Sequence, residues 1–371
     1  MLLCERMNED FPEYVQIDGL HERDQWRMQS GWTHGQDHHK FGKNESNGKF
    51  EVVDALGLGQ GSLGSVQEIR VKGGKINIVR KIVSLPQEQG MQRKRGIVQN
   101  EAETLKRLEH DHIVFLIGRC EEVSARGVLF YHLLMAPVGD QDLAGFLCKI
   151  PDGDVDTQRL HRAWLCAWFS CLSSALGYIQ SKGIRHEDIK PSNIIHRGSR
   201  IYFTDFGSST RFIVGETAST LHPARITMKY AAPESQHDFY INEESSGRIQ
   251  RHGSRSDVFS LGCVFTEMLT VIRGMPLANF QTFCRNARTS TGFAYCLVLE
   301  EIEEWFEEVG ADGDHRRVYE QIIKPMLSLE RKERPRAYET LRLLESEEMR
   351  MILPCQCLHE LQPASDAFLA V

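Results

Sequence analysis

Residues 184–195, which read IRHEDIKPSNII, decide the fold of this chain. A carboxylate, an ammonium and an amide lie within six residues of one another at Asp188, Lys190 and Asn193, and apolar β-branched residues flank them. A loop of this kind can place Asp188 beside a hydroxyl group, Lys190 beside a phosphate and Asn193 on a metal ion. A second carboxylate, Asp205, follows 12 positions after Asn193 at the end of an apolar run. The two segments suit Mg²⁺, which binds one or two carboxylates together with the phosphates of a substrate.

The motifs around this stretch resemble those of the eukaryotic protein kinases. The resemblance implies that residues 184–195 are the catalytic loop and that DFG at 205–207 binds a metal ion. The further motifs, in chain order, are LGQGSLGSV (58–66), INIVRKIV (76–83), a helix with Glu101, LMAPVGD (134–140), YAAPE (230–234), SDVFSLGCV (256–264) and Arg334. They cover about residues 50–346, and their joint appearance by chance is negligible. Lys190, two positions after Asp188, follows the serine/threonine-kinase pattern.

The resemblance implies an α+β fold with two lobes. Residues 49–138 would form a small β-rich lobe with one helix and the hinge, and residues 139–346 a larger, mainly helical lobe. Residues 1–48 are polar and are expected to be a partly disordered extension, with one short helix around residues 24–30. Residues 347–371 are expected to be a short tail.

The glycine-rich segment is a weak signal when it is taken alone. Gly59, Gly61 and Gly64 form a Gly-x-Gly-x-x-Gly pattern, whose backbone N–H groups can approach phosphate oxygens closely. A dinucleotide-binding fold would need a helix directly after it, whereas residues 65–71 are strand-like. A β-hairpin lid over phosphates and a plain hairpin turn remain the two interpretations of this segment.

The resemblance also implies the roles of single residues. Asp188 would orient a substrate hydroxyl and accept its proton, Lys190 would stabilise the transferred phosphate, and Lys81 would hold the α and β phosphates of ATP. Asn193 and Asp205 would bind Mg²⁺. The residues implied to bind ATP are Leu58, Gly59, Gly61, Gly64, Val66, Val79, Lys81, Glu101, Met135, Ala136, Val138, Asp142 and Ile195. Met135 would border the nucleotide pocket, and Asp142 would contact the ribose or a basic substrate side chain.

The resemblance implies contacts between the motifs as well. Glu101 would pair with Lys81, and Arg334 would pair with Glu234. Thr227 would bond Asp188 and Lys190, and Asp257 would brace the backbone of the catalytic loop.

Two segments of the larger lobe carry expectations of their own. Residues 156–181 are predicted to form a long helix with Asp156 as its N-cap. Its apolar face would consist of Leu160, Trp164, Trp168, Leu172, Leu176 and Ile179. The polar residues 236–255 are expected to be an exposed insertion.

Two departures from the family pattern bear on activity. Glu187 replaces the arginine that normally precedes the catalytic aspartate and binds the phosphate of the activation loop, so activation by loop phosphorylation is not expected through that pocket. Val79 replaces an alanine that packs on adenine. The expected function is phosphorylation of serine and threonine hydroxyls on proteins. The alternatives are a pseudokinase that binds nucleotide or partners as a scaffold, and a small-molecule kinase, against which the YAAPE element argues.

The composition limits the other classes. The chain has 371 residues, 41% hydrophobic and 26% charged, which is ordinary for a globular protein. A net charge of −7 argues against a nucleic-acid-binding body, and no apolar run reaches the length of a membrane helix. Ten scattered cysteines indicate reduced thiols and therefore an intracellular protein, in the cytoplasm or the nucleus. Protein substrates, no nucleic acid, no membrane and a monomer are the expectations for its partners.

Overall fold

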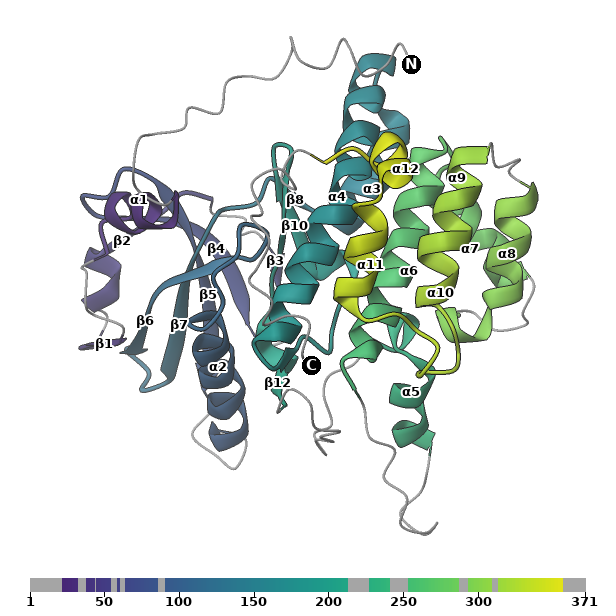
Figure 1. Cartoon of the computed structure of the whole chain (residues 1–371). Helices are drawn as coiled ribbons and strands as arrows, with labels where there is room; N and C mark the ends of the chain where they lie inside the picture. Colours follow the sequence, from purple (N-terminus) through teal and green to yellow (C-terminus); the bar gives the residue numbers. More distant parts are fainter. Residues whose placement is uncertain are drawn as a thin grey trace.

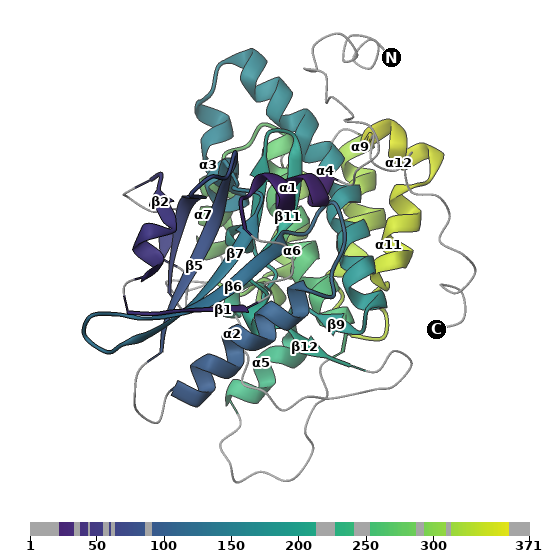
Figure 2. The same cartoon turned by 90° about the vertical axis from the view of Figure 1, so that its left-hand side faces the viewer.

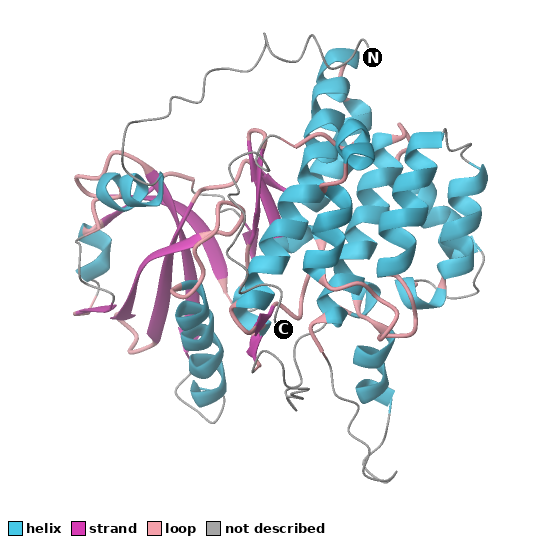
Figure 3. Cartoon of the chain, in the orientation of Figure 1, coloured by secondary structure: helices cyan, strands magenta, loops and turns pink. Residues whose placement is uncertain are grey.

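The computed structural model describes residues 22–32, 38–43, 45–54, 59–60, 64–85, 91–212, 227–240, 253–286, 293–308 and 313–355. Figure 1 shows two lobes, one with a curved sheet and α2, and one built mainly of helices. Figure 3 separates them by secondary structure, with most strands in the first lobe and most helices in the second. The α+β, two-lobed fold predicted from the sequence is confirmed.

The N-lobe contains one sheet in the order β1-β6-β7-β5-β4-β2, with β3 pairing to β4. Its elements are α1 (Glu22–Gln29), β1 (His38–Phe41), β2 (Phe50–Val52), β3 (Gly59–Gln60), β4 (Ser65–Val71), β5 (Asn77–Leu85), α2 (Met91–Leu105), β6 (Phe115–Val123) and β7 (Leu129–Ala136). Seen from the side of this lobe, α1 lies above the sheet and α2 below it (Figure 2). The strand β5, which carries Lys81, is paired on both edges by β4 and β7 and is therefore held rigidly.

The C-lobe follows the hinge. Its strands are β8 (Gln141–Asp142), β9 (Ile184–Arg185), β10 (Ile194–Arg197), β11 (Arg200–Phe203) and β12 (Thr210–Arg211). Its helices are α3 (Leu143–Lys149), α4 (Val155–Ser181), α5 (Pro233–Tyr240), α6 (Arg255–Ile272), α7 (Leu277–Asn286), α8 (Leu299–Glu308), α9 (Gly313–Val318), α10 (Lys324–Met326), α11 (Ala337–Leu344) and α12 (Glu347–Ile352). Two short antiparallel pairs, the β10–β11 hairpin and the β9–β12 pair, flank the catalytic residues.

The helices α4 and α6 form the centre of the C-lobe. On α4, the predicted apolar face is buried from Trp168 to Ile179, whereas Leu160 is exposed and Trp164 is only partly buried, so the buried stripe begins about two turns later than expected. Asp154, rather than the expected Asp156, caps the N-terminus, because its carboxylate accepts hydrogen bonds from the N–H groups of Asp156 and Thr157. The cap fixes where the 27-residue helix begins.

The described part of residues 1–48 adds structure to the N-lobe. The short helix expected near residues 24–30 is present as α1. The strand β1 was not predicted, and it pairs in parallel with β6 at the edge of the sheet. Trp32, Phe41 and Phe50 form a small second core against one face of the sheet, together with residues of β4, β5, β6 and β7. The aromatic residues of the polar N-terminal segment therefore pack on the sheet. Between residues 236 and 255, where an exposed insertion was expected, residues 236–240 are helical in α5, and residues 241–252 lie outside the described part.

Candidate active site

A hydrogen-bonded cluster organises the catalytic loop. One oxygen of the Asp188 carboxylate accepts hydrogen bonds from Lys190 Nζ (2.7 Å) and Asn193 Nδ2 (2.9 Å). The other oxygen accepts from Thr227 Oγ1 (2.9 Å), which itself accepts from Lys190 Nζ (2.7 Å). Thr227 comes from the segment before YAAPE, so the expected contact between the two segments is present. The cluster holds Asp188 and Lys190 side by side, as proton transfer and phosphate stabilisation would require.

Lys81 is bound by two carboxylates from different elements. Its Nζ lies 2.8 Å from both oxygens of Glu101 on α2 and 2.7 Å from Asp205 Oδ1 after β11. Burial alone would lower the pKa of the Lys81 ammonium, but Glu101 and Asp205 together raise it. Burial works against the charge of Asp205, but Lys81 holds the pKa of this carboxyl below its ordinary value. The expected Lys81–Glu101 ion pair is present, and Asp205 joins it.

Buried contacts fix the backbone of both loops. Asp257 on α6 accepts hydrogen bonds from the backbone N–H groups of His186 (2.8 Å) and Glu187 (2.9 Å), as expected. Glu187 and Asp205 have positive φ angles of 63° and 60°, a conformation that costs energy in residues other than glycine and persists only where neighbours impose it. The buried ring of Phe206 packs against the ring of His186, with their centroids 4.7 Å apart, and so helps to hold the loop that carries Asp205.

Most of the residues expected around adenine share one hydrophobic cluster. Val79 on β5 lies opposite Met135 on β7, and both are buried. Val66, Val138 and Ile195 are partly buried and pack against the same cluster. Ala136 is fully buried at the end of β7. These residues come from both lobes, which is the composition expected for a nucleotide pocket.

The glycine lid is only partly described. Leu58 and Gly61 lie outside the described residues, and Gly59 pairs with Val66 in the β3–β4 hairpin. A Cβ atom on Gly64 would lie 1.8 Å from the carbonyl oxygen of Ile82. Gly64 is therefore required for the close approach of this hairpin to β5, whatever it does for phosphates.

Asp142 is occupied by a structural contact. Its Oδ1 accepts a hydrogen bond from the N–H of Gly145 (2.7 Å) and so caps α3. Neighbouring Asp140 accepts from the N–H of Gly198 (2.7 Å). Among the described residues each carboxylate accepts a hydrogen bond through one oxygen only, and the expected contact of Asp142 with ribose or a basic side chain stays a prediction.

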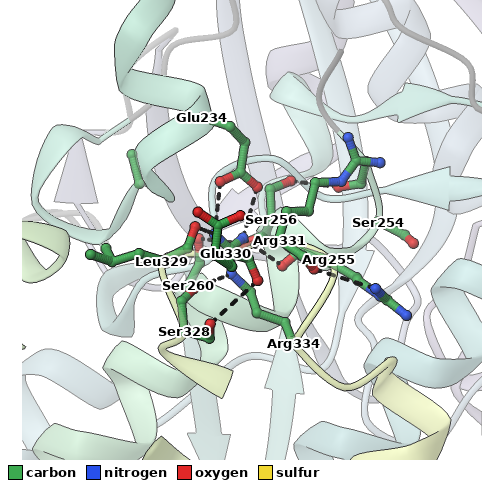
Figure 4. Close-up of polar contacts among 12 residues, drawn as sticks. Glu234, Ser254, Arg255, Ser256, Ser260, Ser328, Leu329, Glu330, Arg331 and Arg334 are labelled. Carbon is green, nitrogen blue, oxygen red and sulfur yellow. Dashed lines mark hydrogen bonds and ion pairs between the residues drawn. The ribbon is translucent and has the colours of Figure 1, made fainter. Parts of the chain in front are cut away.

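The segment after Thr227 is tied to the C-lobe by two carboxylates, the largely buried Glu234 and the fully buried Glu267. Glu234 accepts hydrogen bonds from Nη1 (2.7 Å) and Nη2 (2.8 Å) of the fully buried Arg334, the expected pair that Figure 4 shows in close-up. Glu267 on α6 accepts from Lys229 Nζ (2.8 Å) and from the hydroxyls of Tyr230 (2.9 Å) and Tyr295 (2.7 Å). The roles of Glu267 and Tyr295 are not predicted from the sequence, because nothing in their local pattern separates them from an ordinary helix and loop.

Glu187 occupies a polar pocket of its own. Thr210 Oγ1 donates a short hydrogen bond to its carboxylate, and Arg185 Nε lies 3.4 Å away. Burial raises the pKa of Glu187 to about 7, although Thr210 and Arg185 oppose the shift. Arg185 pairs with Thr210 in the β9–β12 ladder. Glu187 therefore joins the catalytic loop to the strand that follows Asp205 without any added phosphate.

The donor set fits a divalent cation. Asn193 Nδ2 donates to the backbone oxygen and the carboxylate of Asp188, which leaves the Asn193 carbonyl oxygen as a possible ligand. Lys81 binds Oδ1 of Asp205, so its other oxygen can serve as a ligand. Among the residues that the structure describes, no three His, Cys, Asp or Glu side chains gather as a metal site. Two oxygen ligands completed by phosphates and water are typical of Mg²⁺.

Comparison with known proteins identifies the family. A model of the protein kinase domain matches residues 53–343. The chain is 25% identical over 299 residues to probable serine/threonine-protein kinase nek3 of Dictyostelium discoideum, with 80% of this chain and 23% of that protein covered. It is 26% identical over 241 residues to CBL-interacting protein kinase 4 of Oryza sativa subsp. japonica, with 65% and 48% covered. It is 27% identical over 271 residues to cyclin-dependent kinase 4 of Xenopus laevis, with 70% and 74% covered.

The chain belongs to the protein kinase family. It spans half or less of the length of the first two relatives. Members of this family generally use ATP together with a divalent metal ion. In the part of the chain that the structure describes, no helix is long and apolar enough to cross a membrane.

Proposed function

We propose that this protein transfers the γ-phosphate of ATP to serine or threonine hydroxyls of protein substrates. The observation that carries the proposal is the joint presence of two assembled clusters, Asp188–Lys190–Thr227 and Lys81–Glu101–Asp205. Phosphoryl transfer needs positioning and charge stabilisation more than covalent chemistry, and these clusters provide both. The relatives whose names include serine/threonine kinase support the choice of hydroxyl.

Each residue then has a defined task. Asp188 accepts the proton of the substrate hydroxyl, and Lys190 beside it stabilises the charge on the transferred phosphoryl group. Lys81, held by Glu101, binds the α and β phosphates. Mg²⁺ on Asn193 and Asp205 would neutralise phosphate charge. Thr227 couples the catalytic residues to the segment that would receive the peptide.

The competing function is a pseudokinase scaffold. Val79 supports it, because this side chain is buried opposite Met135 and carries two carbon atoms more than the alanine that the family has at this position. A smaller adenine pocket would weaken ATP binding and leave the fold intact. The assembled Asp188 and Lys81 clusters favour the active kinase.

One experiment separates these functions. Transfer from Mg·ATP to a generic basic protein should occur with the wild type and fall by at least about a hundredfold in Asp188→Asn, because an amide cannot accept the proton. Phosphoamino-acid analysis should find phosphoserine or phosphothreonine. Thermal shift with Mg·ATP should be similar for both proteins. Nucleotide binding without transfer by the wild type would favour the scaffold, and rapid transfer to a small alcohol or amine instead of protein would favour a small-molecule kinase. We expect an intracellular protein, which cell fractionation tests, and a monomer, which light scattering tests.

A further inference from the structure

The segment of residues 22–32, called here the N-terminal strap, is built into the N-lobe by close contacts. The backbone N–H of Lys75 donates to the carbonyl oxygen of Gln29 (2.7 Å). Gly31 has a φ of +74°, and a Cβ atom there would lie 2.8 Å from the backbone of Gly74. Trp32 stacks on Phe50 with ring centroids 6.0 Å apart. The strap is thus packed too closely against the sheet to be a loose tail.

Arg23 anchors the strap to the turn between α2 and β6. Its side chain is buried, and its guanidinium donates to the backbone oxygens of Leu108 (3.1 Å), His110 and Ile113 (3.2 Å). Burial lowers the pKa of Arg23, but Asp111 and Glu109 favour the charged form. The rigid fork of guanidinium N–H groups suits several fixed acceptors at once. One side chain therefore fixes the shape of the turn over residues 106–114.

This turn leads to both carboxylates that bind Lys81. On its N-terminal side it continues from the last turn of α2, which carries Glu101. On its other side it is joined to β11, because Val114 N–H donates to the Phe203 oxygen (3.0 Å) and Phe203 N–H donates to the His112 oxygen (2.9 Å). Asp205 follows Phe203 by two residues. A displacement of the turn would therefore move Glu101 and Asp205 relative to Lys81.

The strap also reaches the other lobe. Trp26 packs edge-on against Phe115 at 6.4 Å, and the guanidinium of Arg197 lies 4.7 Å from the centre of the Trp26 ring. Arg197 ends β10, the strand that follows the catalytic loop. Arg23, Trp26 and Phe115 also border a pocket with Pro137 of the hinge segment. The strap thus contacts the turn, the back of the hinge segment and a C-lobe hairpin.

We propose that Arg23 is a positioning residue for phosphoryl transfer, which acts through the turn over residues 106–114 to align Glu101 and Asp205 on Lys81. The strap is then part of the catalytic unit, although it lies before the residues that match the kinase family model. This inference rests on the proposed kinase function for its effect on rate. The proposed effect of Arg23 on the order of α2 can be measured by hydrogen exchange, without any activity.

Variants on one helix test the proposal in the 371-residue chain. Arg23→Met keeps an apolar stem and removes all three hydrogen bonds, and Arg23→Lys keeps a charge that can reach fewer acceptors. Arg27→Met is the matched control, because Arg27 lies on the same helix, is partly exposed and contacts Asp24 at 3.6 Å. We measure kcat and KM for Mg·ATP and peptide, and amide hydrogen exchange over residues 99–114 with α6 as the internal reference.

The expected results differ between the variants. Arg23→Met should lower kcat/KM for Mg·ATP by about ten- to hundredfold while changing the KM for peptide little, since small misplacements of catalytic groups have effects of that size. It should speed exchange over residues 99–114 and leave α6 protected. Arg23→Lys should recover part of both effects, and Arg27→Met should match the wild type within about twofold.

Other results would overturn the proposal. One is that Arg23→Met keeps the kcat/KM and the exchange rates of the wild type. The other is that Arg23→Met loses as much protection in α6 as over residues 99–114, which would show that Arg23 only stabilises the fold. If the wild type transfers no phosphate, the kinase function has failed, and the exchange over residues 99–114 decides alone whether Arg23 orders α2.

Discussion

The ammonium of Lys229 lies 2.8 Å from the buried carboxylate of Glu267. The hydroxyls of Tyr230 and Tyr295 donate to the same carboxylate oxygen, at 2.9 and 2.7 Å. The rings of Tyr230, Phe293 and Tyr295 surround the ammonium at 4.9, 5.3 and 5.5 Å. This contact ties the segment between Thr227 and Glu234, where peptide would dock, to α6.

Removal of the Lys229 ammonium should destabilise the fold. In Lys229→Met, Glu267 would keep its two tyrosine donors but lose its counter-charge, at a cost of about 2 kcal/mol in the free energy of unfolding. Lys324→Met is the control, since Lys324 pairs with Glu303 where both side chains are about half exposed, and should cost less than about 1 kcal/mol. Urea unfolding measures both. Equal costs would show that burial of Glu267 contributes nothing to the strength of its ion pair.

The Glu187 carboxyl should make stability depend on pH. Burial raises its pKa to about 7 in the folded protein, whereas the unfolded chain has the ordinary value of 4.5. Between these values only the folded state holds the proton, so this group's contribution is complete below the unfolded pKa and is lost as the pH rises through 7. Asp257, which also raises the pKa, and Arg185 and Thr210, which lower it, face the carboxyl.

Glu187→Gln tests this dependence, because a neutral amide has nothing to titrate. Urea unfolding between about pH 5 and about pH 8 should show a smaller loss of stability in Glu187→Gln than in the wild type. Glu304→Gln, on the exposed face of α8, should retain the wild-type slope. A Glu187→Gln profile parallel to that of the wild type would mean that Glu187 is ionised throughout.

The ion pair of Arg334 and Glu234 should be costly to break. Arg334 is fully buried and binds both oxygens of Glu234, so Arg334→Met would leave a largely buried carboxylate without its partner. We expect a loss of roughly 3–5 kcal/mol in the free energy of unfolding. Arg316→Met is the control, because it breaks an exposed pair with Glu320 four residues along the chain. It should change the free energy of unfolding by less than about 0.5 kcal/mol. Chemical denaturation would contradict this if the two variants unfolded at the same midpoint.

The sequence predicts the parts of this site that depend on short, ordered motifs. Asp188, Lys190 and Asn193 lie in one loop, and the Lys81–Glu101 pair follows from the register of a strand and a helix. Through the family resemblance it also predicts distant pairs such as Glu234 with Arg334, but it does not predict distant contacts that no motif carries. The bond of Asp205 to Lys81 joins residues 124 positions apart, and Glu267 gains its role from tyrosines on other elements. The parallel edge strand β1 was also missed, because a short polar strand of histidines lacks an alternating pattern.

Two glycine substitutions should have effects of opposite sign. In β6, next to a register shift, a Cβ atom on Gly118 would lie 2.2 Å from Nε1 of Trp32, so Gly118→Ala must displace the ring and loosen the small core that Trp32 forms with Phe41 and Phe50. We expect a loss of roughly 1–3 kcal/mol in the free energy of unfolding. Gly96 lies inside α2, where a Cβ atom would meet nothing within 4 Å. Gly96→Ala should therefore stabilise the protein by up to about 1 kcal/mol, since alanine favours a helix.

The cause of the Gly118 effect can be isolated with a second residue. Trp32→Leu removes the indole that the new methyl group would strike, so Gly118→Ala should cost less in that background than in the wild type. Thermal and urea unfolding of the four proteins in this cycle give the coupling between the two positions. A coupling near zero would mean that the strand itself, rather than the packing of the N-terminal strap, requires glycine at position 118. A large coupling would show that Trp32 is seated on β6 in solution, and would place the strap in the same cooperative unit as the sheet that carries Lys81.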